Sequence, residues 1–298
     1  MTATIPVAVP RKGRPLEAVL DRLATLTGTA EVADEICSTL RYEKAITKGR
    51  RTETANVYER LAEYSELSDP TRPEYTLVRD DRAEKPRRIV FDSLTLEHED
   101  LRLELVGREE PFRALRKHEF ALGFDSADLV LEEVVSLRPE PLSTIDDLNA
   151  RIDPRDTDVR VVTGLGDTVH HTLMGRPELG ESFTREFLRG YAGPLCISPR
   201  YERLVEAILG TEIIEDIEFR YPGPDVEDEE AAIAETGVGV YLTVTGGTAR
   251  DHGLIVGERL FPSETVLMEN APEADCEAVR RVKQLFDGAE IDTHIPIQ

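Results

Sequence analysis

The stretch VGVYLTVTGGTARDHGL, residues 238–254, carries the clearest signal for the fold. An apolar, β-branched run predicts a strand, the central Thr245-Gly246-Gly247-Thr248 predicts a tight turn, and the residues after it predict the start of a helix. Glycines at such a turn let backbone N–H groups approach an anion, and threonine hydroxyls add further donors. The GxxxxGK[ST] spacing of a P-loop is absent, so a purely structural turn stays an alternative to an anion site.

Strands and helices alternate along the rest of the chain. This alternation predicts an α/β protein with largely parallel sheets. Residues 66–88 carry three prolines and many charges, which indicates a loop or hairpin outside the core. The clearest further elements are strands over 4–9, 89–96 and 101–107, a strand that runs into a glycine turn over 159–166, and helices over 15–26, 30–40, 52–65 and 275–287.

A second candidate anion site follows the first predicted strand. Arg11, Lys12, Gly13 and Arg14 place three cations around a glycine. Ligands of open α/β folds bind at the carboxyl ends of strands, where these cations are expected, and Arg and Lys are suited to phosphate or pyrophosphate. A solvated basic segment with no ligand is the alternative.

Composition excludes several function classes. The 298 residues include 59 Asp or Glu and 36 Lys or Arg, a net charge of −23, which disfavours general nucleic-acid binding. No apolar run approaches the ~18 residues of a membrane span, and the N-terminal residues do not resemble a signal peptide. We therefore expect a cytoplasmic protein. The oligomeric state is left open, a homo-oligomer included.

The basic residues are strongly biased, with 30 Arg and six Lys. A carboxylate-rich surface that is poor in Lys is favoured where intracellular salt is high, because salt screens charge repulsion. The composition thus suggests a halophilic cytoplasm, with an ordinary acidic soluble protein as the alternative.

Three blocks of the chain, about 65 residues together, resemble the ATP phosphoribosyltransferases that start histidine biosynthesis, in the order found in that family. IPVAVPRKGRPLEAVLDRL is similar to their opening, REEPFRALRKHEFALGFDSADLVLEE to a middle segment, and VTGGTARDHGL to their phosphoribosyl-diphosphate loop. Positions that match in the last two blocks are Arg108, Pro111, Leu122, Gly123, Asp128, Thr245, Gly246, Thr248, Gly253 and Leu254.

The resemblance implies two α/β domains of the type II periplasmic-binding-protein kind with the active site in the cleft between them. The first domain would comprise residues 1–135 and 256–298, with an insertion around 40–90, and the second residues 136–255. A solute-binding protein would share this fold, but the sequence shows no export signal.

The resemblance also implies Mg²⁺, phosphoribosyl diphosphate and ATP as ligands. Thr245 to Thr248 would cradle the 5′-phosphate, and Arg11 to Arg14 would face the pyrophosphate or nucleotide. A base nitrogen would attack the anomeric carbon as pyrophosphate leaves, so positioning and charge neutralisation would carry catalysis.

Two departures from the family pattern concern the ribose. Tyr241 and Val244 occupy places where the family has acidic residues. Glu227 and Asp251 are the candidates for contacting the ribose instead. The departures leave a second hypothesis open, in which the chain is a non-catalytic regulatory paralogue that binds a nucleotide or another phosphorylated ligand.

Other signals are weaker. His170-His171 lacks a third metal ligand at a recognisable spacing, so no metal-binding residue is assigned. The acidic run DVEDEE, residues 225–230, is expected to be a solvated face.

Overall fold

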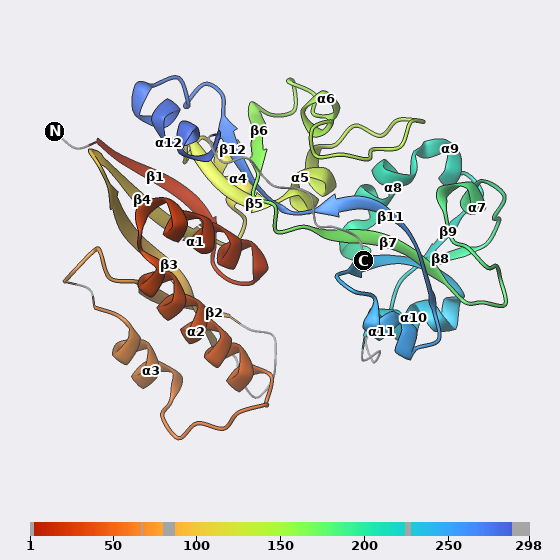
Figure 1. Ribbon diagram of the computed structural model, residues 1–298, viewed down its shortest axis with the longest axis horizontal. Coiled ribbons are helices and arrows are strands. Elements are labelled where there is room, and N and C mark those ends of the chain that lie inside the picture. The colour runs from red at the N-terminus through yellow and green to blue at the C-terminus, as the bar shows by residue number, and fades with distance from the viewer. Residues whose placement is uncertain (1–2, 67, 80–86, 224–227, 288–298) are drawn as a thin grey trace. The chain divides into compact units, whose positions relative to one another are not determined.

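The computed structural model describes residues 3–66, 68–79, 87–223 and 228–287. By contacts between Cα atoms the chain divides into two compact units, each with its own sheet (Figure 1). Unit 1 comprises residues 1–125, 158–166 and 265–298, and unit 2 comprises 126–157 and 167–264. The sequence-based division places its boundaries near residues 135 and 255, so it assigns residues 126–135 and 256–264 to the other part. The fold class, two α/β domains, is confirmed; the cleft between them stays a prediction.

Unit 1 is built from one sheet and the helices around it. Its strands are β1 (Ala3–Pro10), β2 (Glu74–Arg79), β3 (Arg87–His98), β4 (Leu101–Arg108), β5 (Leu122–Ser126), β6 (Val159–Gly164) and β12 (Thr265–Asn270). Its helices are α1 (Arg14–Thr27), α2 (Ala30–Thr47), α3 (Val57–Tyr64), α4 (Pro111–Arg116) and α12 (Glu277–Asp287).

The unit 1 sheet has the strand order β2-β3-β4-β1-β5-β12-β6 among the described residues. Strand β1 lies near its centre and pairs in parallel with both β4 and β5. The hairpins β2–β3 and β3–β4 are antiparallel, and so is the β12–β6 pair. This sheet is therefore mixed, and the expectation of largely parallel sheets is wrong, because antiparallel pairs lie on both sides of the parallel strands β4, β1 and β5.

Helical periodicity explains how α1 covers this sheet. Leu16, Val19, Leu20 and Leu23 recur at helical spacing, and all four side chains are buried. Gly28 then ends the helix in the left-handed conformation with φ 72°, and its N–H donates to the Ala24 carbonyl. The helix that starts directly after β1 is thus fixed against the core.

The described residues of the region 40–90 include two helices and two strands. Helix α2 continues to Thr47, seven residues beyond its expected end, and α3 begins with an Asn56–Glu59 capping box. Strand β2 forms the sheet edge, and its Tyr75 is 7% exposed and belongs to the core cluster. The prediction of a hairpin within residues 66–88 is confirmed for β2, which pairs with β3. The prediction that this segment lies outside the core is wrong, because Tyr75 is buried in it.

Unit 2 contains a five-stranded mixed sheet among its described residues, in the order β11-β7-β10-β8-β9. Its strands are β7 (Val169–Gly175), β8 (Pro194–Cys196), β9 (Glu218–Arg220), β10 (Val238–Thr243) and β11 (Ile255–Ser263). Its helices are α5 (Ala127–Val134), α6 (Leu148–Arg151), α7 (Arg185–Arg189), η1 (Pro199–Tyr201), α8 (Glu202–Leu209), α9 (Thr211–Ile214), α10 (Glu229–Thr236) and α11 (Gly247–Asp251).

Strand β10 holds the middle of this sheet. It runs antiparallel to β7 and parallel to β8, and its first three residues are buried. The strand therefore presents its carboxyl end, and the turn that follows, from a supported position. Across the described residues, no helix combines the length and the apolar composition that crossing a membrane requires.

Candidate functional site

The turn 245–248 follows β10 as the sequence predicts. Gly246 adopts a φ of 68°, in the left-handed region that favours glycine, and α11 begins at Gly247. A Cβ atom on Gly246 would come within 2.7 Å of a methyl carbon of Val256. Glycine at this position thus satisfies both the backbone conformation and the packing against β11.

This turn leaves hydrogen-bond donors unengaged. Among the described residues, the backbone N–H groups of Gly247 and Thr248 find no acceptor. Arg250 braces the turn from within, because its Nη2 donates to the Thr245 carbonyl at 2.8 Å. Since α11 spans only five residues, its dipole adds little, and the free N–H groups and the exposed threonine hydroxyls are the features suited to an anion.

The first turn of α10 places carboxylates beside the strand and helix that flank this turn. Asp228 caps α10 by accepting from the Ala231 N–H at 2.9 Å and lies 3.2 Å from His252 Nε2. The Tyr241 hydroxyl hydrogen-bonds to Glu229, and burial together with this carboxylate raises the pKa of Tyr241. The acidic cluster Asp228–Glu229–Glu230 therefore lies beside β10 and the C-terminal end of α11.

This acidic cluster is partly buried and so differs from a solvated face. Glu230 is 9% exposed, and burial, followed by the charges of Asp228 and Glu229, raises its pKa. The expectation that residues 225–230 form a solvated face is wrong at Glu230. Sequence reasoning missed the cluster, although an aspartate three residues before Ala231 at a helix start is an N-cap signal.

The basic segment 11–14 lies at the carboxyl end of β1, as expected, but two of its cations have partners. Arg11 Nε donates to the Gly107 carbonyl at 3.0 Å, and its Nη2 lies 3.3 Å from Asp92 Oδ1. Lys12 Nζ lies 3.4 Å from Glu109 Oε2, with both side chains more than a third exposed. Gly13 turns the chain into α1 with a φ of 82°.

Strand β4 contributes further to this end of the sheet. Pro10 pairs in register with Arg108, and the Arg108 guanidinium lies 4.9 Å from the centre of the Phe120 ring. A Cβ on Gly107 would come within 2.9 Å of Arg11 Cγ, so this glycine makes room for the Arg11 side chain. Asp92 and Glu109 were missed by sequence reasoning, because only the pairing of β3, β4 and β1 brings them here.

The structure thus collects the predicted residues into two sets. Residues 245–248 with the exposed Asp251 lie in unit 2, and residues 11–14 lie in unit 1. That the two sets face each other stays a prediction. Glu227 lies outside the described residues.

His171 is part of a buried polar cluster. Its Nε2 lies 3.2 Å from Asp128 Oδ1, and the Ser263 hydroxyl donates to Asp128 Oδ2 at 2.8 Å. All three residues are at most 3% exposed. Because the aspartate, not the histidine, lies between the other two, the arrangement differs from a nucleophile–histidine–acid triad, and it joins the first helix of unit 2 to β7 and β11.

Solved structures of low sequence identity resemble the chain. The chain is similar to the ATP phosphoribosyl transferase (HisG:HisZ) complex from Thermotoga maritima, with 15% identity over 95% of this chain and 97% of that one and a TM-score of 0.43. It is also similar to the periplasmic VFT2 domain of BvgS from Bordetella pertussis, with 10% identity over 97% and 89% of the two chains and a TM-score of 0.40. No curated protein sequence matches the chain significantly.

A family-wide sequence comparison is decisive. The profile of the halobacterial ATP phosphoribosyltransferases matches residues 1–297, which include the segment 11–14, the middle block and the turn 245–248. The chain therefore belongs to the halobacterial ATP phosphoribosyltransferase family.

Proposed function

We propose that this protein is an enzyme that transfers the phosphoribosyl group of phosphoribosyl diphosphate to a nucleotide, ATP being the acceptor that the family name implies. The observation that carries the proposal is the turn 245–248, whose geometry suits a phosphate, within a chain that the family profile matches over 1–297. The same family suggests a biosynthetic role in the cytoplasm.

In this proposal the 5′-phosphate binds to the turn 245–248. The N–H groups of Gly247 and Thr248 and the hydroxyls of Thr245 and Thr248 donate to the phosphate oxygens. Gly246 holds the turn open, since any side chain there would collide with Val256. Donors fixed before the ligand arrives lose little entropy on binding, which favours accurate placement of the sugar.

The cations of segment 11–14 bind the pyrophosphate or the nucleotide. Within the described residues, Lys12 has one long ion-pair contact, to an exposed carboxylate, so it can exchange Glu109 for a ligand oxygen. Arg11 is braced by Gly107 and Asp92 and keeps the segment in place. Positive charge at the departing pyrophosphate stabilises the transition state of this reaction.

Contacts to the ribose come from α10 in this proposal. Tyr241 replaces a family carboxylate, but Glu229 approaches its hydroxyl from α10. Glu229 can accept a hydrogen bond from a ribose hydroxyl in place of the tyrosine. Asp251, exposed on α11, is the second candidate.

Mg²⁺ is part of the proposal through the family. No group of three or more His, Cys, Asp or Glu side chains in the described part of the chain is arranged to hold a metal ion. Mg²⁺ in phosphate chemistry commonly needs only one or two carboxylates in addition to the substrate phosphates, and Asp228 and Glu229 fit that requirement. When bound, the ion would neutralise charge on the diphosphate.

Titration calorimetry with phosphoribosyl diphosphate and Mg²⁺, followed by a pyrophosphate-release assay on adding ATP, tests the proposal. We expect binding and release in the wild type and a loss of roughly tenfold in affinity for Thr248→Val, which removes one donor to a charged group. Thr25→Val, at an exposed position of α1, is the control. Absence of phosphoribosyl-diphosphate binding would contradict the proposal.

The second candidate function is a non-catalytic regulatory paralogue that binds a nucleotide or another phosphorylated ligand. This candidate is favoured by Tyr241 and Val244, which carry no carboxylate. Val244 is also 74% exposed. Binding of phosphoribosyl diphosphate and ATP without any release of pyrophosphate would support this reading over the enzyme.

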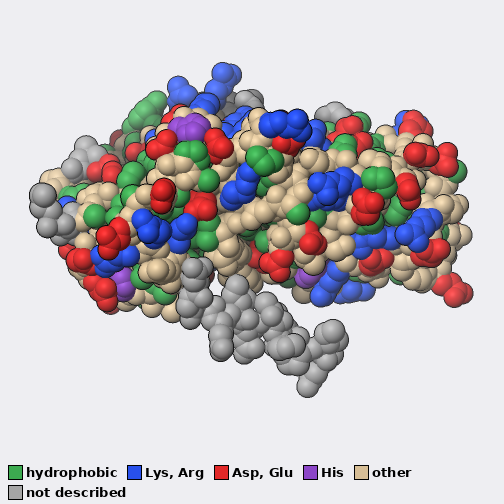
Figure 2. Space-filling model, turned by 90° about the horizontal axis from the view of Figure 1, so that it is seen from above, with side chains coloured by type: hydrophobic (Ala, Val, Ile, Leu, Met, Phe, Trp, Pro, Cys, Tyr) green, Lys and Arg blue, Asp and Glu red, His purple; other side chains and the backbone are tan. Residues whose placement is uncertain are grey.

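A high-salt setting is a separate proposal that rests on the charge. The net charge is −23, and Figure 2 shows acidic side chains over the visible face with basic ones interspersed among them. Salt screens the repulsion between these carboxylates. We expect the melting temperature to rise from low to multimolar KCl, and no rise would contradict a halophilic adaptation.

A further inference from the structure

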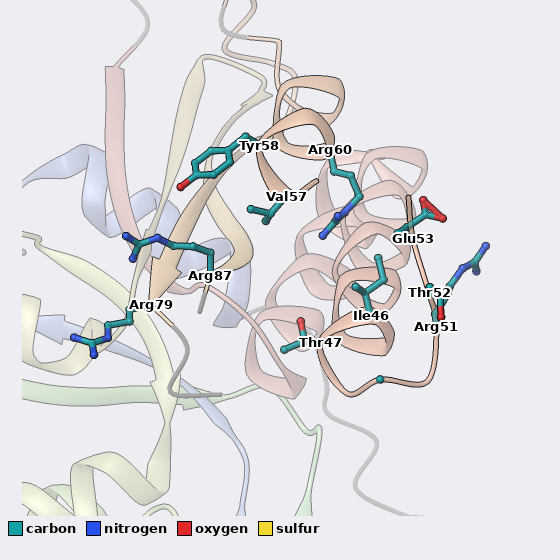
Figure 3. Close-up of a pocket in the computed structure, with 11 residues that line it drawn as sticks. Ile46, Thr47, Arg51, Thr52, Glu53, Val57, Tyr58, Arg60, Arg79 and Arg87 are labelled. Carbon is teal, nitrogen blue, oxygen red and sulfur yellow. The ribbon is translucent and has the colours of Figure 1, made fainter. Parts of the chain in front are cut away.

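A pocket of about 790 Å³ is lined by residues of unit 1. Its walls are the end of α2, the segment 49–53, the start of α3, the last residue of β2 and the first residue of β3 (Figure 3). This volume is in the range of roughly 300–1,000 Å³ that binds small organic molecules. Neither candidate anion site contributes a lining residue.

The walls of this pocket are braced from behind by a buried ion pair. Arg60 Nε and Nη2 donate to the two carboxylate oxygens of Glu43 at 2.7 and 2.9 Å, which ties α3 to α2. Arg60 Nη1 donates to the Ala55 carbonyl at 2.7 Å, which holds the segment between the helices. The capping box at Asn56 fixes the entry into α3. The pocket is therefore preformed.

The floor is mainly apolar. Figure 3 shows Ile46 and Val57 toward its middle, with the Tyr58 ring at one end. Tyr58 is 62% exposed, among the most exposed large apolar side chains of the described residues. An exposed aromatic ring beside apolar side chains favours a ligand with a planar apolar body.

The rim is cationic. Figure 3 shows Arg79 and Arg87 on one side of the pocket and Arg51 on the other, with their guanidinium groups extending outward from Ile46 and Val57. Within the described residues neither Arg79 nor Arg87 has an ion-pair partner, and residues 80–86 between them lie outside that set. Arg51 stacks over the Tyr42 ring at 4.3 Å, and Glu53, the carboxylate in the lining, hydrogen-bonds to the Tyr42 hydroxyl.

We propose that this pocket is a second ligand site, which binds an organic anion with a planar apolar body in the pocket and a carboxylate or phosphate head at Arg79 and Arg87. The chain has 59 acidic and 36 basic residues, whereas the described residues at this rim include three arginines and one carboxylate, a local excess of positive charge. A neutral ligand would make no ion pair with these arginines, whereas a small inorganic anion would bury none of the apolar floor. The site is independent of the proposed transfer reaction.

Titration calorimetry of the full chain with three two-ring probes tests the inference: 2-naphthyl phosphate, 2-naphthoate and the neutral 2-naphthylmethanol. We expect 1:1 binding of at least one anion, at least about tenfold tighter than the neutral probe. The head that binds more tightly identifies the ligand as a phosphate or a carboxylate. Saturating phosphoribosyl diphosphate should leave this binding unchanged.

Two variants and a control give the inference its sharpest test. Arg79→Gln with Arg87→Gln should weaken the anionic probe about tenfold and leave the neutral probe within about twofold. Thr52→Trp, which fills the pocket from an exposed position, should weaken both probes. Arg155→Gln with Arg189→Gln makes the same charge change at exposed arginines of unit 2 and should change neither probe.

Several outcomes would overturn the inference. They are an absence of saturable binding, equal affinities for charged and neutral probes, equal losses in the arginine and control variants, and competition by phosphoribosyl diphosphate.

Discussion

The two candidate anion sites are built on opposite principles. The turn 245–248 offers backbone N–H groups and hydroxyls whose positions are fixed by Gly246, and it contains no charged side chain. The segment 11–14 offers cations, but Arg11 and Lys12 already have carboxylate partners. The first site should therefore depend on shape, and the second on charge that a ligand must attract away from a neighbour.

Gly246→Ala should have the largest effect on this comparison. The substitution forces a Cβ into a left-handed conformation and against Val256, at a cost of roughly 2 kcal/mol in the free energy of unfolding. Because the turn must move to relieve the clash, phosphoribosyl-diphosphate binding should be lost in titration calorimetry. Denaturant unfolding measures the stability change.

Gly247→Ala is the matched control for that variant. A Cβ on Gly247 would meet only Thr245 Oγ1, at an ordinary contact distance of 3.7 Å. Its unfolding free energy should change by less than about 0.5 kcal/mol, which is typical of unstrained sites. Equal losses of stability in the two variants would show that the turn is not selected for its geometry.

Arg11→Gln and Lys12→Gln should separate bracing from binding in the basic segment. Arg11→Gln removes contacts to Gly107 and Asp92 and should lower the free energy of unfolding by about 1 kcal/mol. Lys12→Gln should leave stability nearly unchanged and weaken phosphoribosyl-diphosphate binding roughly tenfold. Unfolding and calorimetry on both proteins check this, and the reverse assignment would overturn the roles given to the two side chains.

Much of this comparison could be expected from the sequence. The strand–turn–helix at 238–254 and the cations after the first strand are local features, so periodicity and glycine placement find them. Burial of Leu16 to Leu23 on one face of α1 follows from the same reasoning. The partners of Arg11 could not be expected, because Asp92 and Gly107 reach it only through the register of β3, β4 and β1.

Two strands of unit 2 were missed for a related reason. Strand β7 contains His170, His171 and Thr172, and β11 contains Glu258 and Arg259, so neither shows an apolar alternation. Their polar residues are accommodated by tertiary partners, as His171 is by Asp128 and Glu258 is by Arg185. Sequence patterns record burial well, but they do not record which polar groups will find partners inside the fold.

Salt should change the affinity for phosphoribosyl diphosphate a few-fold, and it should act on the segment 11–14 more than on the turn 245–248. Phosphoribosyl-diphosphate affinity should fall as KCl rises, because screening weakens the attraction to segment 11–14. Lys12→Gln should flatten this dependence, whereas Thr248→Val should lower the affinity and leave the slope unchanged. Affinities at several KCl concentrations, all high enough to keep the chain folded by circular dichroism, measure both slopes. If Lys12→Gln leaves the dependence of affinity on KCl concentration unchanged, the charge of Lys12 does not contribute to ligand binding.

The smallest effect concerns the acidic flank of the turn. Burial raises the pKa of Glu230 above its ordinary value of 4.5, so the unfolded chain releases this proton first as the pH rises. Ionisation of Glu230 therefore lowers the free energy of unfolding as the pH increases from acidic values toward neutral, by less than about 1 kcal/mol. Glu230→Gln avoids this loss.

Glu230→Gln should then match the wild type in stability near pH 4 and exceed it progressively toward pH 7. Glu235→Gln removes the same charge at an exposed position of α10 and controls for the change in net charge. Urea unfolding at a series of pH values compares the three proteins. A gain that is equal for both variants would trace the effect to overall repulsion in this acidic chain. A gain confined to Glu230→Gln would show that burial of this carboxylate beside the turn itself opposes folding, as expected where a fold keeps an acidic group close to a binding site.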